Sequence, residues 1–145
     1  MTTTVAAQSR TGRSLVTDTE FDMLATFCAD EYRLERRVAD HVVDQALALV
    51  HVMGTTGQGA TMAPSQLVDP GWHTLILHTG WYADWCHKQF GYFLHHQPNS
   101  KVRTRGLMTS VVEKLRAAGF EVDDRLWGTA ANCNPPACCG DGPCC

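Results

Sequence analysis

The sequence predicts an all-α protein, a single compact bundle of about five helices. Several segments carry apolar residues at spacings of three and four, which is typical of a helix with one buried face. No segment shows the sustained alternation of apolar and polar residues that is typical of a strand. The 145 residues are 44% hydrophobic and 19% charged, which suits one ordinary domain. We therefore expect a helical domain over 15–127, between a flexible N-terminal arm over 1–14 and a disordered, cysteine-rich tail over 128–145.

Two helices are expected in the first half of the chain. Thr17 or Asp18 can cap a first helix that runs to about residue 30, because both side chains accept hydrogen bonds from free N–H groups. Its buried face is expected to consist of Phe21, Leu24, Ala25 and Cys28. Helical spacing predicts a longer second helix over 34–53. The glycine-rich segment 54–61 lacks the lysine of a phosphate-binding loop and follows a helix, so we interpret it as a connection.

Three further helices are expected, over residues 70–78, 81–90 and 102–118. Asp69 followed by Pro70 is a favourable start for the first of them, since aspartate caps a helix and proline suits its first position. Thr79-Gly80 can break the chain between the first two. Beyond the last long helix, Asp123 can cap a short terminal turn that packs back on the bundle.

Charge and hydropathy exclude several classes of function. The net charge is −3, so there is no basic excess to neutralise a phosphate backbone, and nucleic-acid binding is disfavoured. No stretch approaches the roughly 20 apolar residues of a membrane span. The first residues lack the apolar run of a signal peptide. We expect a cytoplasmic protein that binds neither nucleic acid nor a membrane, with thiols that are reduced or metal-bound.

The segment 69–96 holds five of the seven histidines and is where we expect chemistry. Metal ligands must converge on one point, which on a helix requires spacings of three or four. Asp69 and His73 meet this criterion, whereas His73 and His78 are five residues apart and could share a metal only if the helix distorts near Gly80. His96 could close the site from the following segment. We therefore expect a candidate metal site formed by His73, His78 and His96, with Cys86 or Asp69 as a fourth ligand. Zinc suits this mixture of ligands, and copper or iron is an alternative. The competing interpretation is a polar network in the core, in which Asp69 is a helix cap and Cys86 fills space.

A motif across this segment resembles a known family. It reads V-D-x-x-W-H-x-x-x-L-H-x-x-x-Y-x-x-x-C-x-x-x-x-G-x-x-x-x-H over residues 68–96. It resembles the N-terminal helical domain of the plant glycine-rich domain-containing proteins, and more closely a group of small uncharacterised actinobacterial proteins. The resemblance implies an all-helical fold and supplies no established activity. The plant pattern usually has a further histidine where this chain has Leu75, and the plant glycine-rich region is absent, so RNA-related roles are not carried over.

The C-terminal tail concentrates five of the seven cysteines in the last 13 residues, in the pattern C-x₄-C-C-x₄-C-C. These candidate thiolates are Cys133, Cys138, Cys139, Cys144 and Cys145. Such a tail could bind a soft ion such as Cu(I) or zinc. It could also be a peptide that modifying enzymes act on, or a redox-active segment. Adjacent cysteines bridge each other poorly, which argues against a simple disulfide pair within each doublet.

These observations favour a small metal-binding protein that has a histidine-centred site in its helical domain and a thiolate-rich tail. The expected partners are a metal ion and a protein that modifies the tail or accepts the metal. One alternative is a ribosomally synthesised peptide precursor, in which the folded domain acts as the leader and the tail is the modified product. A second alternative is a metal-dependent enzyme. The sequence does not indicate which reaction or substrate such an enzyme would have.

Overall fold

The computed structural model describes residues 8–57, 61–97 and 106–129, and their regular structure is helical, which confirms the predicted all-α class. The cysteine-rich tail from residue 130 lies outside the described residues, as does the start of the N-terminal arm. The elements in chain order are η1 (Gly12–Leu15), α1 (Asp18–Tyr32), α2 (Arg36–Thr56), α3 (Asp69–Leu77), α4 (Thr79–Phe90), α5 (Leu107–Ala117) and α6 (Asp124–Trp127).

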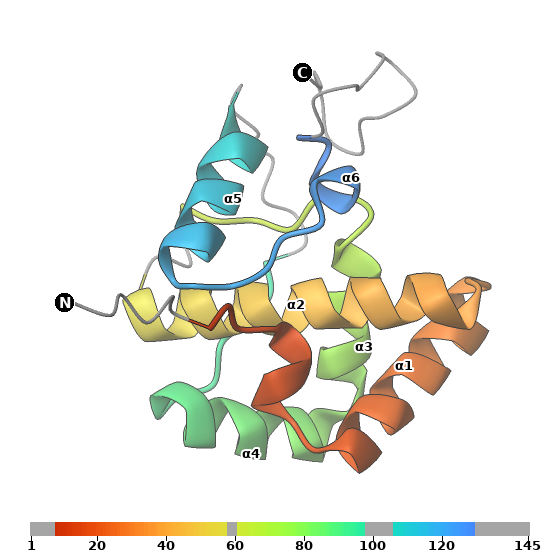
Figure 1. Cartoon of the computed structure of the whole chain (residues 1–145). Helices are drawn as coiled ribbons and strands as arrows, with labels where there is room; N and C mark the ends of the chain where they lie inside the picture. The colour runs from red at the N-terminus through yellow and green to blue at the C-terminus, as the bar shows by residue number, and fades with distance from the viewer. Residues whose placement is uncertain (1–7, 58–60, 98–105, 130–145) are drawn as a thin grey trace, which may run out of the picture.

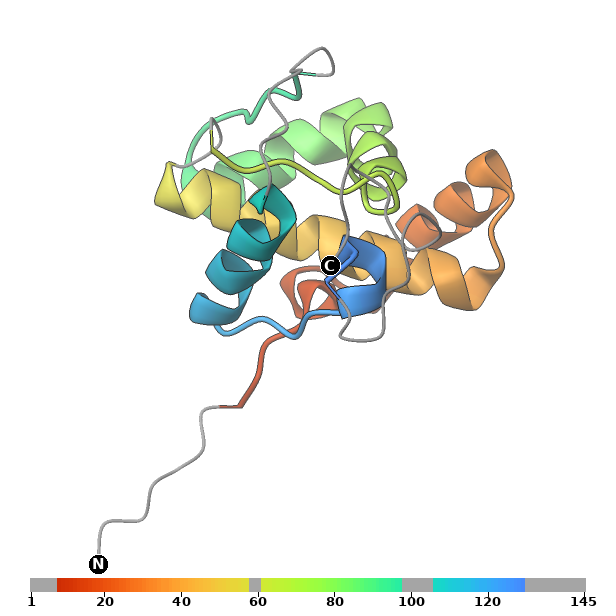
Figure 2. The ribbon, with the colours of Figure 1, turned by 90° about the horizontal axis from the view of Figure 1, so that it is seen from above.

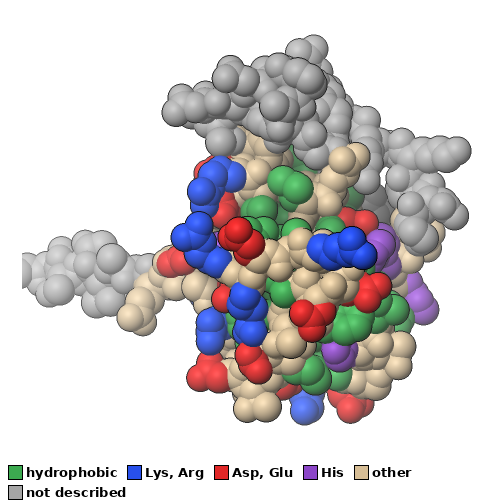
Figure 3. Space-filling model, turned by 90° about the vertical axis from the view of Figure 1, so that its right-hand side faces the viewer, with side chains coloured by type: hydrophobic (Ala, Val, Ile, Leu, Met, Phe, Trp, Pro, Cys, Tyr) green, Lys and Arg blue, Asp and Glu red, His purple; other side chains and the backbone are tan. Residues whose placement is uncertain are grey.

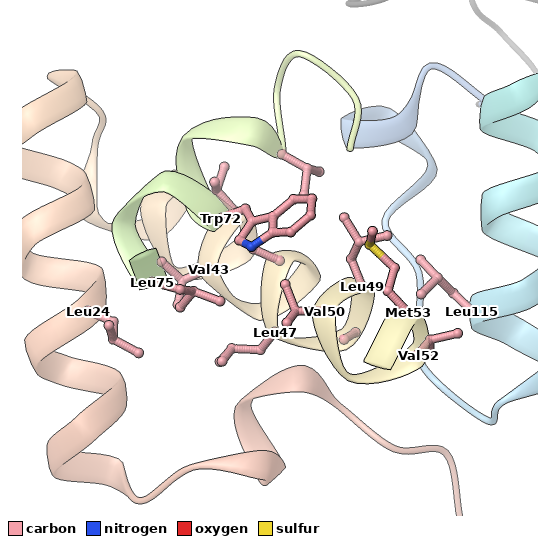
Figure 4. Packing of buried hydrophobic residues seen from close by; sticks show 14 of the residues in the cluster. Leu24, Val43, Leu47, Leu49, Val50, Val52, Met53, Trp72, Leu75 and Leu115 are labelled. Carbon is pink, nitrogen blue, oxygen red and sulfur yellow. The ribbon is translucent and has the colours of Figure 1, made fainter. Parts of the chain in front are cut away.

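The long helix α2 runs through the middle of the molecule, with α4 on one side of it and α5 on the other (Figures 1 and 2). All residues from Ala46 to Val50 are buried, so this part of α2 is apolar around its whole circumference. A helix with that pattern must be surrounded by other elements. Figure 4 shows Leu75 of α3 and Leu115 of α5 among the side chains that pack around it. Within the described residues, no helix is both long and apolar enough to cross a membrane.

The helix ends follow local sequence signals. Thr17 caps α1 in a reciprocal capping box with Glu20, and Gly57 ends α2 in the left-handed conformation. Asp123 caps α6, as predicted, by accepting a hydrogen bond from the N–H of Arg125. These signals depend on neighbours within a few residues, which is why the sequence alone reveals them.

The buried Gln45 of α2 anchors the C-terminal segment. Its Oε1 accepts a hydrogen bond from the indole N–H of Trp127, at 2.8 Å, and another from the N–H of Asp123. Its Nε2 donates to the carbonyl of Glu121. A buried amide must satisfy its donors and acceptors, and these bonds hold α6 and the preceding turn against α2.

The structure corrects the prediction of a flexible arm over 1–14 for the part of it that is described. Gly12 is buried against α2, so close that an added Cβ would lie 1.8 Å from the carbonyl oxygen of Asp44. Arg10 donates its backbone N–H to the carbonyl of Gly119, at 2.7 Å. This segment is polar and weakly patterned, but glycine lets its backbone approach α2. The contacts are long-range, and local sequence patterns do not predict them.

Helix α3 crosses α2 at Gly71, and this crossing places the start of α3. An added Cβ at Gly71 would lie 2.7 Å from the Cβ of Ala46 and 2.7 Å from the carbonyl oxygen of Val42. The helix begins at Asp69, with Pro70 in its first turn, as the sequence predicts. It ends at Leu77, because His78 leaves the helical region with φ −85° and ψ 64°, and α4 starts at Thr79 in a new direction.

Candidate metal centre

Three of the predicted ligands converge at the start of α3. Asp69 and His73 are four residues apart and share one face of the helix, while His96 reaches the same point from the segment that follows α4. The Nε2 atoms of His73 and His96 are 3.1 Å apart. Asp69 Oδ1 lies 2.9 Å from His96 Nε2, and Asp69 Oδ2 lies 3.3 Å from His73 Nε2. Two imidazole nitrogens and one carboxylate therefore face a common point.

These separations suit ligands of a single small cation. Ligand atoms about 2.1 Å from one ion lie roughly 3.0 Å apart when they meet at right angles and about 3.4 Å apart in a tetrahedron. The three observed separations, 2.9, 3.1 and 3.3 Å, fall in or close to that interval. Little rearrangement would be needed for all three side chains to bind one ion.

The cluster has an inner and an outer side. The His96 side chain is only 12% exposed, whereas the side chains of Asp69 and His73 are 33% and 39% exposed. Figure 3 shows exposed histidine side chains beside acidic and hydrophobic ones on one face of the molecule. An ion held by these three residues would have protein on the His96 side and an accessible side toward solvent.

The positions that hydrogen atoms can take on the two imidazole rings also favour the binding of a cation. Two neutral imidazoles whose Nε2 atoms are 3.1 Å apart cannot both point an N–H at the other, so at least one of them presents its lone pair. An ionised carboxylate offers further lone pairs beside it. The point that the three side chains share is therefore rich in electron pairs.

The His96 ring is held from the side by aromatic packing. It stacks on the indole of Trp72, with ring centroids 4.2 Å apart and an angle of 18° between the planes. Its other nitrogen, Nδ1, is buried and has no hydrogen-bond partner within the described part of the chain. The Trp72 N–H donates to the hydroxyl of Tyr82, at 3.2 Å, and that hydroxyl donates to the carbonyl of Leu94, at 2.6 Å.

Comparison with known proteins places the domain that carries this cluster in a family. The family model described as UCP032817-like matches residues 15–117, which is most of the chain. The chain belongs to the UCP032817-like family. No curated protein and no solved structure matches it. The resemblance to the plant glycine-rich domain-containing proteins and their actinobacterial relatives is not tested by this match and stays a prediction.

His78 lies within the UCP032817-like region but does not join the cluster, which corrects the site predicted from the sequence. Its Nδ1 bonds the carbonyl of Thr74, at 2.7 Å, and the edge of its ring meets Phe27. Among the described residues, the group that could hold a metal ion contains Asp69, His73 and His96 without it. The reason is the helix break at His78 itself, which leaves this side chain folded back on the preceding turn.

Cys86, another predicted ligand in the UCP032817-like region, also lies apart from the cluster. It is a fully buried free thiol in α4, next to the hydroxyl of Tyr82 and the backbone of Leu94. Burial raises the pKa of the Cys86 thiol, so the neutral form is favoured, whereas a metal ligand must be a thiolate. These features fit the competing interpretation, in which Cys86 fills space in the core.

Sequence reasoning missed the part that two residues play in the site. It considered only side chains that can bind a metal directly, so Trp72 and Tyr82 were not among the predicted site residues. Both are buried, and both also contact the segment that carries His96. Their presence in the sequence motif was the available signal, since Trp72 directly precedes His73 in it.

Proposed function

We propose that this chain binds a divalent metal ion through Asp69, His73 and His96. The observation that carries the proposal is the convergence of the Asp69 carboxylate and two Nε2 atoms, with Oδ1 2.9 Å from His96, Oδ2 3.3 Å from His73, and the two nitrogens 3.1 Å apart. Zinc is the first expected ion, since it accepts imidazole and carboxylate ligands. Iron and copper remain the alternatives, and a set of two histidines and one carboxylate is also typical of iron(II) sites.

The number of ligands bears on what the site would do. Zinc sites with a structural role usually have four protein ligands, whereas three protein ligands leave a position for water or a substrate. The partial exposure of Asp69 and His73 supports an open position on the solvent side. This observation favours a metal-dependent enzyme as the second candidate function, ahead of a purely structural metal site.

The tail cysteines belong to the proposal as a separate thiolate-rich site. They lie outside the described residues, so their support comes from the sequence pattern alone. The peptide-precursor alternative concerns the same tail, and the intact mass of the protein from its native host tests it. A mass that shows dehydration, oxidation or cleavage would favour the precursor, and an unmodified mass would favour thiolates that are free to bind metal.

Zinc titration of a full-length protein whose five tail cysteines are replaced by serine tests the domain site. This variant is expected to bind one zinc ion per chain. Asp69→Asn, His73→Gln and His96→Gln are each expected to lower the affinity for zinc by about 100-fold or more. Removing a residue that only hydrogen-bonds to a ligand costs about 10- to 100-fold, and removing the ligand itself should cost at least as much.

The matched control is His95→Gln, because His95 is an exposed histidine directly before His96 in the chain. It should bind zinc as the parent protein does. Absence of zinc from the parent protein, or equal losses for the substitutions at His95 and His96, would refute the proposed site.

A further inference from the structure

We infer that Trp72 and Tyr82 position His96 for metal binding, in place of the hydrogen bond that usually orients a ligand histidine. The inference rests on the proposed function and adds two positioning residues to the site. The contacts that tie them to the site are the stacking of Trp72 on the His96 ring and the bonds of Tyr82 to Trp72 and to the Leu94 carbonyl. Their effect would therefore be exerted through His96 and the backbone beside it.

The surroundings of His96 explain why its ring needs to be positioned by other residues. A histidine that binds metal through one ring nitrogen usually donates the N–H of the other to a carboxylate, a backbone carbonyl or water, which fixes the ring orientation. Nδ1 of His96 is buried and has no hydrogen-bond partner among the residues that the structure describes. When Nε2 binds a metal, a contact other than a hydrogen bond from Nδ1 to these residues is therefore needed to hold the ring in its plane.

The stacking on Trp72 meets this need. The two rings lie nearly parallel, 18° apart, with their centroids at 4.2 Å. A parallel stack restricts the tilt of the imidazole while leaving its edge free to face Asp69 and His73. Trp72 is itself buried, with 3% of its surface exposed, and it is the residue directly before His73 on α3. One side chain of α3 thus orients a ligand that belongs to a different segment.

A single hydroxyl links this stack to the backbone of the His96 segment. The hydroxyl of Tyr82 accepts the Trp72 N–H and donates its own hydrogen to the carbonyl of Leu94, two residues before His96. Tyr82 is fully buried, so both bonds are shielded from water. It therefore fixes the indole on which His96 stacks and also the chain that carries His96.

The test is Tyr82→Phe in the full-length protein with the five tail cysteines changed to serine. This substitution keeps the ring and removes only the hydroxyl, which releases the Trp72 N–H and the Leu94 carbonyl. Loss of an outer-shell partner typically weakens metal binding about 10- to 100-fold. We expect a fall of that size in the affinity for zinc and for cobalt(II), and an altered visible spectrum of cobalt(II) at saturation, which reports ligand geometry.

The matched control is Tyr92→Phe. The Tyr92 hydroxyl also donates to a backbone carbonyl, that of Gly54, at 2.8 Å, and this bond involves neither the cluster nor Trp72. It should leave metal affinity and the cobalt(II) spectrum unchanged. A folded Tyr82→Phe protein with unchanged affinity and spectrum would overturn the inference, as would an equal loss for Tyr92→Phe.

A second pair of variants serves if Tyr82→Phe does not fold. Trp72→Phe removes the indole N–H and part of the stacking surface, while Trp85→Phe removes an indole that donates to the Leu15 carbonyl away from the site. Only the first should weaken metal binding, and equal behaviour of the two would overturn the inference.

If the parent protein binds no metal, the proposed function fails. If it binds through Asp69, His73 and His96 whatever stands at Tyr82 or Trp72, only the positioning role fails.

Discussion

At the scale of single residues, the hydrogen bonds of the His51 side chain depend on the protonation state of its ring. It is half-buried on α2, and its Nδ1 lies 2.8 Å from the Oε1 of Gln89, an acceptor. Its Nε2 faces the guanidinium of Arg10, a donor, at 3.4 Å. The neutral ring with its hydrogen on Nδ1 satisfies both neighbours. The ring thereby links α4 and the N-terminal segment to α2.

This geometry predicts how stability depends on pH. Burial foremost, together with the nearby charge of Arg10, lowers the pKa of His51 below its ordinary value of 6.5, against the opposing effect of Gln89. At pH values between the folded and the unfolded pKa, the unfolded chain therefore binds a proton at His51 that the folded protein does not bind. The contribution of His51 to stability is therefore complete above about pH 6.5 and is lost as the pH falls below it.

Chemical denaturation from pH 8 to pH 4.5, with and without His51→Gln, measures this contribution. The parent protein should lose more free energy of unfolding than the variant as the pH falls below about 6.5. Comparing the two removes the effect of the other histidines, which titrate in both. Parallel curves would show that His51 does not couple protonation to folding.

At the scale of elements, the crossing of α2 and α3 positions two of the three proposed ligands. Asp69 and His73 flank Gly71, whose backbone lies close against Val42 and Ala46 of α2. The added Cβ of an alanine would lie 2.7 Å from both Ala46 Cβ and Val42 O, a distance that real Cβ contacts essentially never show. Because one of these atoms belongs to the backbone of α2, the helices themselves would have to separate.

Gly71→Ala is therefore expected to lower the free energy of unfolding by about 1–3 kcal/mol, the usual cost of an overpacked core. Gly80→Ala is its matched control, since Gly80 lies in α4 and an added Cβ there meets nothing within 4 Å. The control should be neutral or more stable by up to about 1 kcal/mol, because alanine favours helix. Urea denaturation of both variants decides, and equal stabilities would contradict the close crossing.

At the scale of the whole molecule, the sequence predicts the helices and part of the site. Helix ends at Thr17 and Asp69 depend on neighbouring residues, and so does the spacing that places His73 beside Asp69. The arrival of His96 at the same point depends on tertiary packing, which spacing along one helix does not reveal. His78 was predicted wrongly because the break between α3 and α4 falls on that residue, a change of backbone conformation that the nearby Thr79-Gly80 only suggested.

The N-terminal segment gives the same lesson for long-range contacts. Its polar composition predicted a flexible arm, yet Gly12 packs against α2 and Arg10 bonds the backbone of Gly119. Nothing in the local sequence pattern distinguishes a glycine that ends a helix from one, such as Gly12, that lets two backbone segments approach closely. Such contacts follow from the assembled bundle, as does the stacking of Trp72 on His96.

The most direct test of the proposed metal centre is the X-ray absorption spectrum of the zinc-loaded full-length protein whose five tail cysteines are replaced by serine. A centre formed by Asp69, His73 and His96 should show nitrogen and oxygen ligands alone, at about 2.0–2.2 Å, with the outer scattering of two imidazoles. His96→Gln should remove one of these imidazoles. Sulfur at about 2.3 Å, which would bring Cys86 or Cys28 to the metal, would contradict it, as would a protein that retains no zinc.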